Sequence, residues 1–505
     1  MLTLIAMGLI TGAVLLLYFL CVKKAPKPNE PPSPGWMPLV GSLPYMKKNL
    51  ASQMLEGFPN SPLVTLYYGL EPVYILNNFE AFDEAMVKQG QRFIGRPVRV
   101  LQKPTLGSDG GIVSTEGELW REYRRFSLKT LRDFGFGRQG GEEIILREAG
   151  ELCEAIDSTP AGQALSTTDL LSPAVSNVIC QLVFGARTAT EDPRFPKLLD
   201  MFQSLTQRRA ARHMNIMLGA NYKYFEQFSF LAKLMLLRPE RRRVIQLSRQ
   251  LLQFCKEQVA KHKGDADMQS EPRDYIDAHL QHQTNLESDR IFNDLRLAMA
   301  IRDLFVAGTD TTSNTLRWGI LYMIENPDVA EKVFEEIRVN VGTERMPTMK
   351  DKGSLHYTVA VLEEVQRLGT LVPMGVAHRC VEDSVICGYR IPADSVVVPN
   401  IYGIHRDPRV FPEPEKFKPE RYLDAEGRFS PNESVVPFGS GKRACLGESL
   451  ARMELFVFFT RLMQRYRFGL DPAERRSISE IKDNTENHGG GIRAPAEHKI
   501  VFTPR

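Results

Sequence analysis

The chain has 505 residues, enough to bury a large core, and its 43% hydrophobic and 25% charged residues are typical of a globular protein. Its 64 basic and 61 acidic residues nearly cancel to a net charge of +3, which argues against nucleic acid as a partner. The seven cysteines are irregularly spaced and form no CxxC pair, which argues against a zinc ribbon.

The N-terminal segment predicts a single transmembrane helix. Residues 1–22 carry no charge, and a helix of about 20 apolar residues crosses a bilayer. A cleavable signal peptide, the alternative, would carry basic residues before a shorter apolar run. Here Lys23, Lys24 and Lys27 follow the apolar run, so we expect a retained anchor with all later residues on the cytosolic side. Residues 23–45 are basic and rich in proline, which favours a stiff, extended hinge.

Residues 46–505 are interpreted as one mainly α catalytic domain with small β-sheets, because no repeat or flexible linker divides them. The alternating pattern of residues 63–78 predicts a pair of strands, and residues 385–400 predict a hairpin. The longest predicted helix covers residues 288–326, between a capping serine and the stop signal of a proline.

Several short patterns resemble motifs of other enzymes but lack the required context. GFGRQG (135–140), DFG (133–135) and HRD (405–407) occur in the wrong order for a protein kinase, and no magnesium-binding Asn follows HRD. No strand precedes the glycine pattern, as a dinucleotide site requires. His279 and His282 form HxxH without a third metal ligand, so we expect a solvated polar helix face.

The segment PFGSGKRACLGESLA (437–451) places Cys445 in a glycine-rich loop immediately before an amphipathic stretch. Its glycines allow tight turns and close approach of the backbone to a flat partner. The N–H groups at a helix start, together with Lys442 and Arg443, would favour the thiolate form of the cysteine. On these grounds two interpretations stay open: a thiolate ligand of a metal macrocycle, or a structural cysteine beside an anion-binding loop.

The segment AGTDTT (307–312) lies in the middle of the long predicted helix. Gly308 and the threonines are poor helix formers, so a local widening or kink is expected. Asp310 and Thr311 stand side by side, where an acid and an alcohol can hold water and pass protons. The alternative is a threonine hydroxyl bonded to the preceding turn of its own helix.

Two charge patterns occur on predicted helices. Glu364 and Arg367 are spaced for an i,i+3 ion pair, but other ExxR patterns occur that are expected to be solvated. WREYRRFSLKTLRDFG (120–135) places its basic residues on one stripe, which by itself indicates a wet helix face. The solvated ExxR pairs are Glu122/Arg125, Glu240/Arg243 and Glu335/Arg338, and the stripe is Arg121, Arg125, Lys129 and Arg132.

Within the cysteine segment, FGSGKRACLG matches the FxxGxRxCxG signature of the haem-thiolate monooxygenases. With its anchor, proline hinge, ExxR and PERY (419–422), the chain resembles the cytochrome P450 superfamily, closest to the animal microsomal, family 2-like branch. The resemblance implies the P450 fold and a haem b cofactor whose iron takes Cys445 as axial ligand, which favours O–O cleavage. It also implies that Asp310 and Thr311 deliver protons to iron-bound dioxygen. The signature positions are Phe438, Gly441, Arg443, Cys445 and Gly447.

The resemblance assigns further residues around the cofactor. Glu364, Arg367 and Arg421 would form a buried structural lock, although the family usually has Phe where this chain has Tyr422. Removing one member of a buried charge network costs several kcal/mol. Contacts to the haem propionates are implied for one tryptophan, one histidine and three arginines. The cofactor-binding set is Arg96, Trp120, Arg124, His378, Phe438, Arg443, Cys445 and Gly447.

The implied activity is insertion of one atom of O2 into a lipophilic steroid, fatty acid or xenobiotic on the cytosolic face of the endoplasmic reticulum membrane. NADPH electrons would arrive through cytochrome P450 reductase docked on the basic stripe, with cytochrome b5 as a second candidate partner. Residues 97–115 and 198–237 would form part of the substrate pocket. A non-catalytic haem sensor or carrier and an oxygen-independent haem-thiolate isomerase are the alternatives; the Asp310–Thr311 pair argues against both.

Overall fold

The structure is a computed structural model, and it describes most of the chain outside the N-terminal segment. Among the helices that it describes, none is long and apolar enough to cross a membrane. The predicted anchor of residues 1–22 lies outside the described residues apart from Gly12, and so does the predicted pocket segment 198–237. The described residues are 12, 30–97, 111–187, 239–284 and 291–505, with gaps at 38–40, 48, 70, 136–138, 266–269 and 484–490.

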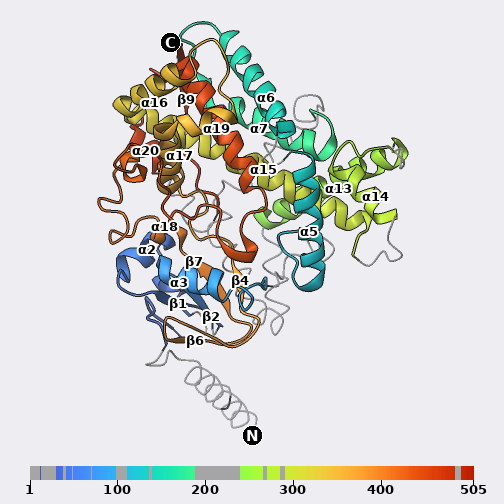
Figure 1. Ribbon diagram of the computed structural model, residues 1–505. Helices are drawn as coiled ribbons and strands as arrows, with labels where there is room; N and C mark the ends of the chain where they lie inside the picture. Colours follow the sequence, from blue (N-terminus) through green and yellow to red (C-terminus); the bar gives the residue numbers. More distant parts are fainter. Residues whose placement is uncertain are drawn as a thin grey trace.

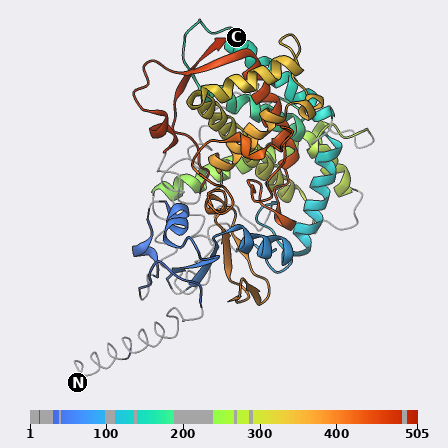
Figure 2. The ribbon, with the colours of Figure 1, turned by 60° about the vertical axis from the view of Figure 1, so that its left-hand side comes forward.

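A small β-rich part forms one end of the molecule and a larger helical body forms the rest (Figures 1 and 2). The main sheet has the strand order β1-β2-β7-β4, in which β2 is antiparallel to β1 and parallel to β7. The predicted strand pair of residues 63–78 is therefore confirmed. The strands are β1 (Leu63–Tyr68), β2 (Glu71–Leu76), β4 (His378–Arg379) and β7 (Val396–Pro399).

The prediction of one hairpin over residues 385–400 is only partly right. The hairpin consists of β5 (Ser384–Ile386) and β6 (Tyr389–Ile391), while β7 leaves it and joins the main sheet. Cys387 and Gly388 both have positive φ angles, of 47° and 82°, which suit the turn of a two-residue hairpin. A second sheet consists of β3 (Leu165–Ser166), β9 (Lys499–Pro504) and β8 (Tyr466–Leu470).

The helical body surrounds one long helix, α15 (Asp294–Glu325), which packs against α7, α13, α17 and α19. Short helical turns join the longer helices, among them η1 (Leu43–Tyr45), η2 (Glu84–Lys88), η4 (Met349–Ser354), η5 (Pro419–Tyr422) and η6 (Gly441–Arg443). The other helices are α2 (Leu50–Gly57), α3 (Phe79–Asp83), α5 (Gly117–Asp133), α6 (Gln139–Asp157), α7 (Thr167–Phe184), α13 (Pro239–Asp265), α14 (Tyr275–Thr284), α16 (Pro327–Asn340), α17 (His356–Gly369), α18 (Ile401–Ile404), α19 (Glu448–Arg465) and α20 (Ile478–Lys482).

Helix α15 begins six residues later than the sequence predicts. The cap is Asn293, whose side chain accepts a hydrogen bond from the Arg296 N–H, and not Ser288. Its C-terminal end agrees with the prediction, because Pro327 begins the next helix. The segment 307–312 is α-helical throughout, without the widened turn that a π-helix would introduce.

The described part of the proline-rich hinge is bonded to the main sheet. The N–H of Thr65 donates to the Pro32 carbonyl at 2.8 Å, and the N–H of Ser42 donates to the Tyr67 carbonyl at 2.6 Å. Ser42 is fully buried. The described part of this segment is thus held against β1 at Pro32 and Ser42.

The predicted solvated face of His279 and His282 is wrong. His279 is fully buried, and its Nε2 lies 2.5 Å from the hydroxyl of Tyr123 on α5. Burial lowers the pKa of His279 to about 3, so it is a neutral side chain of the core. His282 stacks on Phe126 of α5 at 5.0 Å between ring centroids. The sequence does not show that α5 supplies these aromatic partners.

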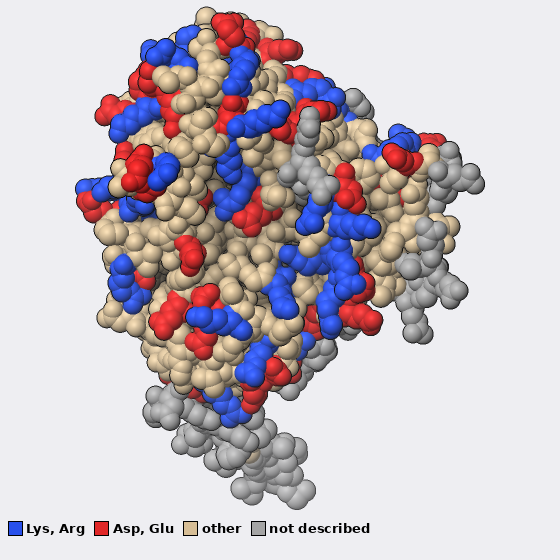
Figure 3. All heavy atoms as spheres, in the orientation of Figure 1, with Lys and Arg blue, Asp and Glu red and all other residues tan. Residues whose placement is uncertain are grey.

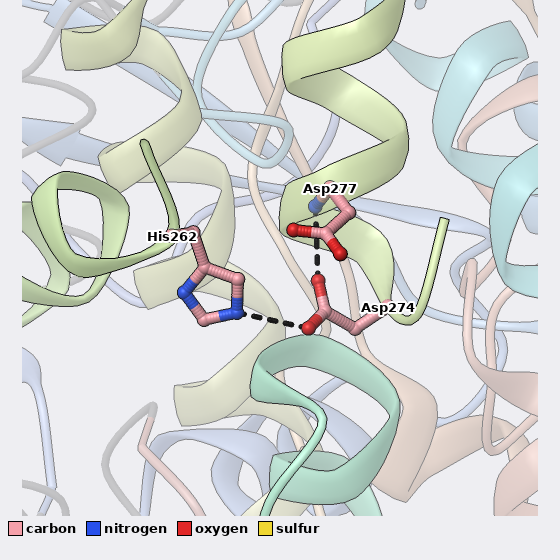
Figure 4. A group of neighbouring side chains, drawn as sticks. All are labelled: His262, Asp274 and Asp277. Atoms are coloured by element: carbon pink, nitrogen blue, oxygen red, sulfur yellow. Dashed lines mark hydrogen bonds and ion pairs between the residues drawn. The ribbon is translucent and has the colours of Figure 1, made fainter. Parts of the chain in front are cut away.

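A buried ion pair joins α13 to the start of α14 (Figure 4). His262 Nε2 lies 2.9 Å from Asp274 Oδ2, and its Nδ1 lies 2.9 Å from the Gln258 carbonyl oxygen. Two acceptors require two ring N–H groups, so this geometry favours the imidazolium form. Asp277 completes the group, but Arg273 donates two hydrogen bonds to its carboxylate. The cluster therefore satisfies itself as an ion-pair network.

The His262–Asp274 pair should make stability depend on pH. Burial lowers the pKa of His262, but the hydrogen bond and charge of Asp274 outweigh burial and raise it above 6.5. The pair should add about 1.5–3 kcal/mol to the free energy of unfolding, the usual size for a charge-assisted hydrogen bond. This stabilisation is fully present below about pH 6.5, and it is lost as the pH rises through the raised pKa of His262 in the folded protein. Thermal unfolding of His262→Gln and the wild type should differ at pH 6 and converge toward pH 9.

The matched control is His356→Gln, a half-buried histidine without an ion pair in the described part of the chain. It should leave the pH dependence of unfolding unchanged. A constant difference between the wild type and His262→Gln from pH 6 to 9 would contradict the ion pair.

Candidate functional site

Cys445 lies between η6 and the start of α19, with its side chain exposed. Its N–H donates to the Phe438 carbonyl at 2.9 Å, which closes the loop. A Cβ added at Gly439 or Gly447 would meet no protein atom within 4 Å, so a flat group can approach the backbone there. At Gly441, which has a φ of 73°, an added Cβ would lie 1.9 Å from the Met86 carbonyl oxygen. The close approach at Gly441 is therefore to η2 and not to a ligand.

The expectation that local groups favour the thiolate of Cys445 is not met by the protein alone. Although the Cys445 side chain is exposed, nearby protein atoms desolvate it in part, and this desolvation raises the pKa of the thiol. The Gly447 N–H and Arg124 act in the opposite direction but do not outweigh burial. A cation that coordinates the sulfur would supply the missing stabilisation, because metal ligation requires the deprotonated thiol.

Helix α15 forms one wall of a small cavity beside the cysteine loop. Thr311, Thr312 and Thr315 line this cavity, facing Pro437 and Phe438 from the loop. Ala307, Thr311 and Thr315, which lie on one face of α15 at four-residue spacing, are accessible, whereas most of α15 is buried. Residues of α17, the two residues after it and α19 line the rest: Val365, Gln366, Gly369, Thr370, Leu371, Ala451 and Leu455, with Trp318 from α15.

The two predicted proton carriers differ in position. The Thr311 hydroxyl donates to the Ala307 carbonyl at 2.7 Å, which is the back-bonded alternative that the sequence left open. Asp310 is buried at 1% exposure and does not line the cavity. Its charge acts on the buried guanidinium of Arg317, where it opposes the lowering of the Arg317 pKa by burial. The structure thus brings Thr311, but not Asp310, to the cavity.

The arginines predicted to bind an anion gather at the other side of the loop. Arg443 lies 3.8 Å above the Trp120 ring and donates to the carbonyls of Ile94 and Thr115. Burial, with the nearby charges of Arg96 and Arg124, lowers the pKa of Arg443 well below its usual value. Three guanidinium groups crowded in this way form a site that an anion would stabilise.

Arg96 and Arg124 also contact the backbone around the loop. Arg96 donates to the carbonyls of Val113 and Ala377, and Arg124 donates to the Ala444 carbonyl at 2.7 Å.

His378 lies beside these arginines as a neutral imidazole, which limits its ability to donate a hydrogen bond to an anion. Burial and the charges of Arg96 and Arg443 lower the pKa of His378 well below 6.5. The neutral ring uses its Nδ1–H for the Phe93 carbonyl at 2.7 Å, so Nε2 can only accept a hydrogen bond. His378 can donate to a carboxylate only after an anion offsets the two arginines.

The three residues predicted to form a lock come together in the core. Arg367 Nε donates to Glu364 Oε2 at 2.7 Å and Arg421 Nε donates to Glu364 Oε1 at 3.1 Å. Glu364 and Arg367 are fully buried. Tyr422, the departure from the family pattern, donates its hydroxyl to Glu364 at 3.0 Å. The pairs Glu122/Arg125 and Glu335/Arg338 are exposed ion pairs, as predicted, and Glu240/Arg243 lies among side chains that the structure does not describe.

Asp303, which no sequence motif indicates, holds the loop at residues 111–113 against α15. Asp303 Oδ2 accepts hydrogen bonds from the N–H groups of Ile112 and Val113, at 2.9 and 3.1 Å. Gly111 is required there, because an added Cβ would lie 2.3 Å from the same oxygen. Asp303 is one turn before Ala307 on α15, and this spacing is the only signal in the sequence.

Taken together, these features define a class of protein. An accessible sulfur, a backbone open to a flat group, and a cluster of arginines fit a macrocyclic metal cofactor with acidic side groups, held through a thiolate on a mainly helical fold. The family model for cytochrome P450 matches residues 31–496. The chain therefore belongs to the cytochrome P450 family, whose members carry a haem iron, and it is a P450 monooxygenase.

Similar proteins cover nearly the full length of the chain. It is 35% identical to cytochrome P450 2B19 of Mus musculus, over 99% of each chain. It is 35% identical to cytochrome P450 2J1 of Oryctolagus cuniculus, over 98% of this chain and 96% of the other. It is 37% identical to cytochrome P450 2D14 of Bos taurus, over 99% and 100%. These relatives are animal family 2 cytochromes P450, as the resemblance in the sequence predicts.

Substituting Glu364→Gln should destabilise the protein strongly, because it leaves the buried Arg367 without its counter-ion. The expected loss in free energy of unfolding is about 3–5 kcal/mol, measured by chemical denaturation. The control is Glu335→Gln, which removes the acid of an exposed ExxR pair with the same spacing and should produce no measurable change. Equal effects of the two substitutions would contradict the structural role of the lock.

Substituting Asp303→Ala should release the loop at Ile112 and Val113, because both N–H groups lose their acceptor. Hydrogen exchange of residues 111–113 should accelerate at least ~10-fold, the equivalent of about 1.4 kcal/mol from two lost hydrogen bonds. The control is Asp294→Ala, at the first residue of the same helix α15. Its half-exposed carboxylate pairs with Lys263 of α13, and its loss should leave this exchange unchanged. Unaltered exchange in Asp303→Ala would show that other contacts hold the loop.

Proposed function

We propose that this P450 monooxygenase inserts one oxygen atom of O2 into a lipophilic substrate, with Cys445 as the axial ligand of haem iron. The observation that carries the proposal is the accessible Cys445 in a loop opposite Thr311, beside the cluster of Arg96, Arg124 and Arg443. The bound haem supplies the oxygen chemistry, to which a thiolate ligand donates electron density.

The residues of the chain bind and orient the cofactor in this proposal. Arg96, Arg124 and Arg443 hold the propionates, and the Trp120 ring packs against the Arg443 guanidinium in a cation–π contact. His378 becomes a further donor once the propionates offset the arginine charges. Phe438 and Gly447 flank the sulfur, where Gly447 leaves room for a flat ring.

Protons are managed from α15. The Thr311 hydroxyl can turn from the Ala307 carbonyl toward the cavity and donate there, since this intrahelical bond is replaceable by water. Asp310, the buried acid that directly precedes Thr311, supplies the next proton. A sensor or carrier of ligands would need neither group, and an isomerase would need no electron donor.

Electrons from NADPH enter through a reductase that docks on α5. Arg121, Arg125, Lys129 and Arg132 are exposed on this helix, and Figure 3 shows basic side chains gathered over it. Arg124 on the same helix contacts the cysteine loop through the Ala444 carbonyl. An acidic surface on the reductase, or on cytochrome b5, is attracted by such a stripe.

The proposed setting is the endoplasmic reticulum membrane, with residues 1–22 as anchor, 23–45 as hinge and 46–505 as the catalytic domain on the cytosolic face. The lack of charge in residues 1–22 and the three lysines that follow support this arrangement. The proposed substrate is a lipophilic molecule of one of three classes: a steroid, a fatty acid or a xenobiotic. All three classes are kept because an apolar pocket discriminates weakly among such molecules.

The carbon monoxide difference spectrum of the reduced protein tests the ligand assignment. Wild-type protein should give the band typical of a thiolate ligand, and Cys445→Ala should lose it, because Cys445 is the exposed cysteine among those that the structure describes. Cys387→Ala, at the half-buried cysteine of the β5–β6 turn, should retain the band. A thiolate-type band in Cys445→Ala would overturn the assignment.

Charge reversal on α5 tests the reductase surface. Arg121→Glu with Arg125→Glu should slow association with the reductase by about 10-fold or more at low salt, with a smaller effect at high salt, because steering is screened. Stopped-flow reduction of the haem measures the rate. Arg475→Glu, at an exposed cation three residues before α20, should have no such effect. Equal slowing by the control would place the docking surface elsewhere.

A further inference from the structure

One polar contact joins α15 to α19 next to the cavity. The hydroxyl of Thr312 donates to Glu454 Oε2 at 2.9 Å. Thr312 is 2% exposed and Glu454 is 1% exposed, so solvent replaces neither partner. Thr312 is the last residue of the AGTDTT segment but has no role in the site described above, and Glu454 lies outside the motifs named there.

Glu454 is a buried acid that forms no ion pair with any residue the structure describes. Its other oxygen, Oε1, has no hydrogen-bond partner in the described part of the chain. On α19 its immediate neighbours Met453 and Leu455 are buried apolar residues. An ionised carboxylate in such surroundings is strongly disfavoured unless it is paired.

The neutral acid fits this geometry better than the carboxylate. Burial raises the pKa of Glu454 to about 8, and the Thr312 hydroxyl opposes burial only in part. Among the described residues no charged side chain on α6, α15, α16 or α17 contributes to the shift. At neutral pH the proton resides on one oxygen, and the other oxygen accepts the bond from Thr312.

The contact lies between two walls of the cavity beside the cysteine loop. Thr311 and Thr312 line it from α15, and Ala451 and Leu455, on either side of Glu454, line it from α19. Phe438, whose carbonyl accepts the Cys445 N–H, lines it from the loop. The Thr312–Glu454 bond therefore fixes the distance between the helix that carries Thr311 and the helix that follows Cys445.

We propose that Glu454 acts as a neutral carboxylic acid that binds Thr312 and thereby positions Thr311 relative to the cysteine loop. Glu454 is a positioning residue, since it reaches the reaction only through Thr312 and α15. The proposal rests on the haem site proposed above in one respect, because its second test reads the haem spectrum. Its first test is independent of the cofactor.

The first test is the infrared spectrum of the full-length holoprotein at pH 7. Subtracting Glu454→Gln from the wild type should reveal one carboxylic C=O band, which an ionised carboxylate lacks. Thr312→Val should shift this band to higher frequency, because the C=O loses its donor. The control is Ser313→Ala, which removes a buried hydroxyl bonded only within α15 and should leave the band unchanged. Absence of the band from the difference would overturn the proposal.

The second test is a pH titration of the haem absorption spectrum. In the wild type, ionisation of Glu454 near pH 8 should alter the α15–α19 contact and shift the spectrum, and Glu454→Gln should lose this transition while keeping the neutral-pH spectrum. Glu454→Leu and Thr312→Val should show the shifted spectrum already at pH 7. A transition that persists in Glu454→Gln, or a Thr312→Val spectrum equal to that of Ser313→Ala, would overturn the proposal.

The two tests also separate this proposal from the assignment of Cys445. If Cys445 were not the iron ligand, the carbon monoxide band would persist in Cys445→Ala while the carboxylic band of Glu454 remained. If Glu454 were ionised, the carboxylic band would be absent while the carbon monoxide band still depended on Cys445. Glu454→Gln has nearly the same shape as the acid and keeps an acceptor for Thr312, so its folding should be preserved.

Discussion

The buried ion pair between Glu364 and Arg367 determines where the cysteine loop can lie. Arg367 also donates to the carbonyls of His405 and Pro414, so one guanidinium holds α17 against the long segment that follows it. The neutral ring of His405 accepts the Val436 N–H at 2.9 Å, immediately before the loop begins. This chain of hydrogen bonds thus links the buried charge pair to the backbone that leads into the cysteine loop. Such a pair persists because both charges are fully hydrogen-bonded, since either one alone would be costly to bury.

Two side chains of this loop have pKa values shifted so that their charged forms are disfavoured. The thiol of Cys445 has a raised pKa, and the guanidinium of Arg443 has a lowered one. Both shifts express the cost of burying a charge without its partner. A single ligand with a central cation and peripheral anions relieves both at once. Both shifts are thus of the sign that such a ligand would reverse.

The sequence predicts this molecule well where the signal is local. The strand pair, the stop of the long helix at Pro327 and the loop around Cys445 all follow from turn, cap and spacing rules. It fails where local signals compete or a partner comes from elsewhere. Asn293 and Ser288 are both good caps by residue type, and the structure has Asn293 as the cap of α15. His279 is polar in sequence but is buried by aromatic residues of α5 and the segment before α15. The pKa of Cys445 depends on burial, which spacing does not reveal.

The contact between Gly441 and Met86 has a consequence for how the molecule comes apart. It presses the cysteine loop against η2, which belongs to the β-rich end, whereas the Glu364–Arg367 pair holds the same loop to the helical body. The cofactor site thus lies at the interface between two parts of the molecule that have separate apolar cores. Local opening of either part would release one side of the cofactor site while the other side stays in place. Loss of the cofactor would then report the first of the two parts to open.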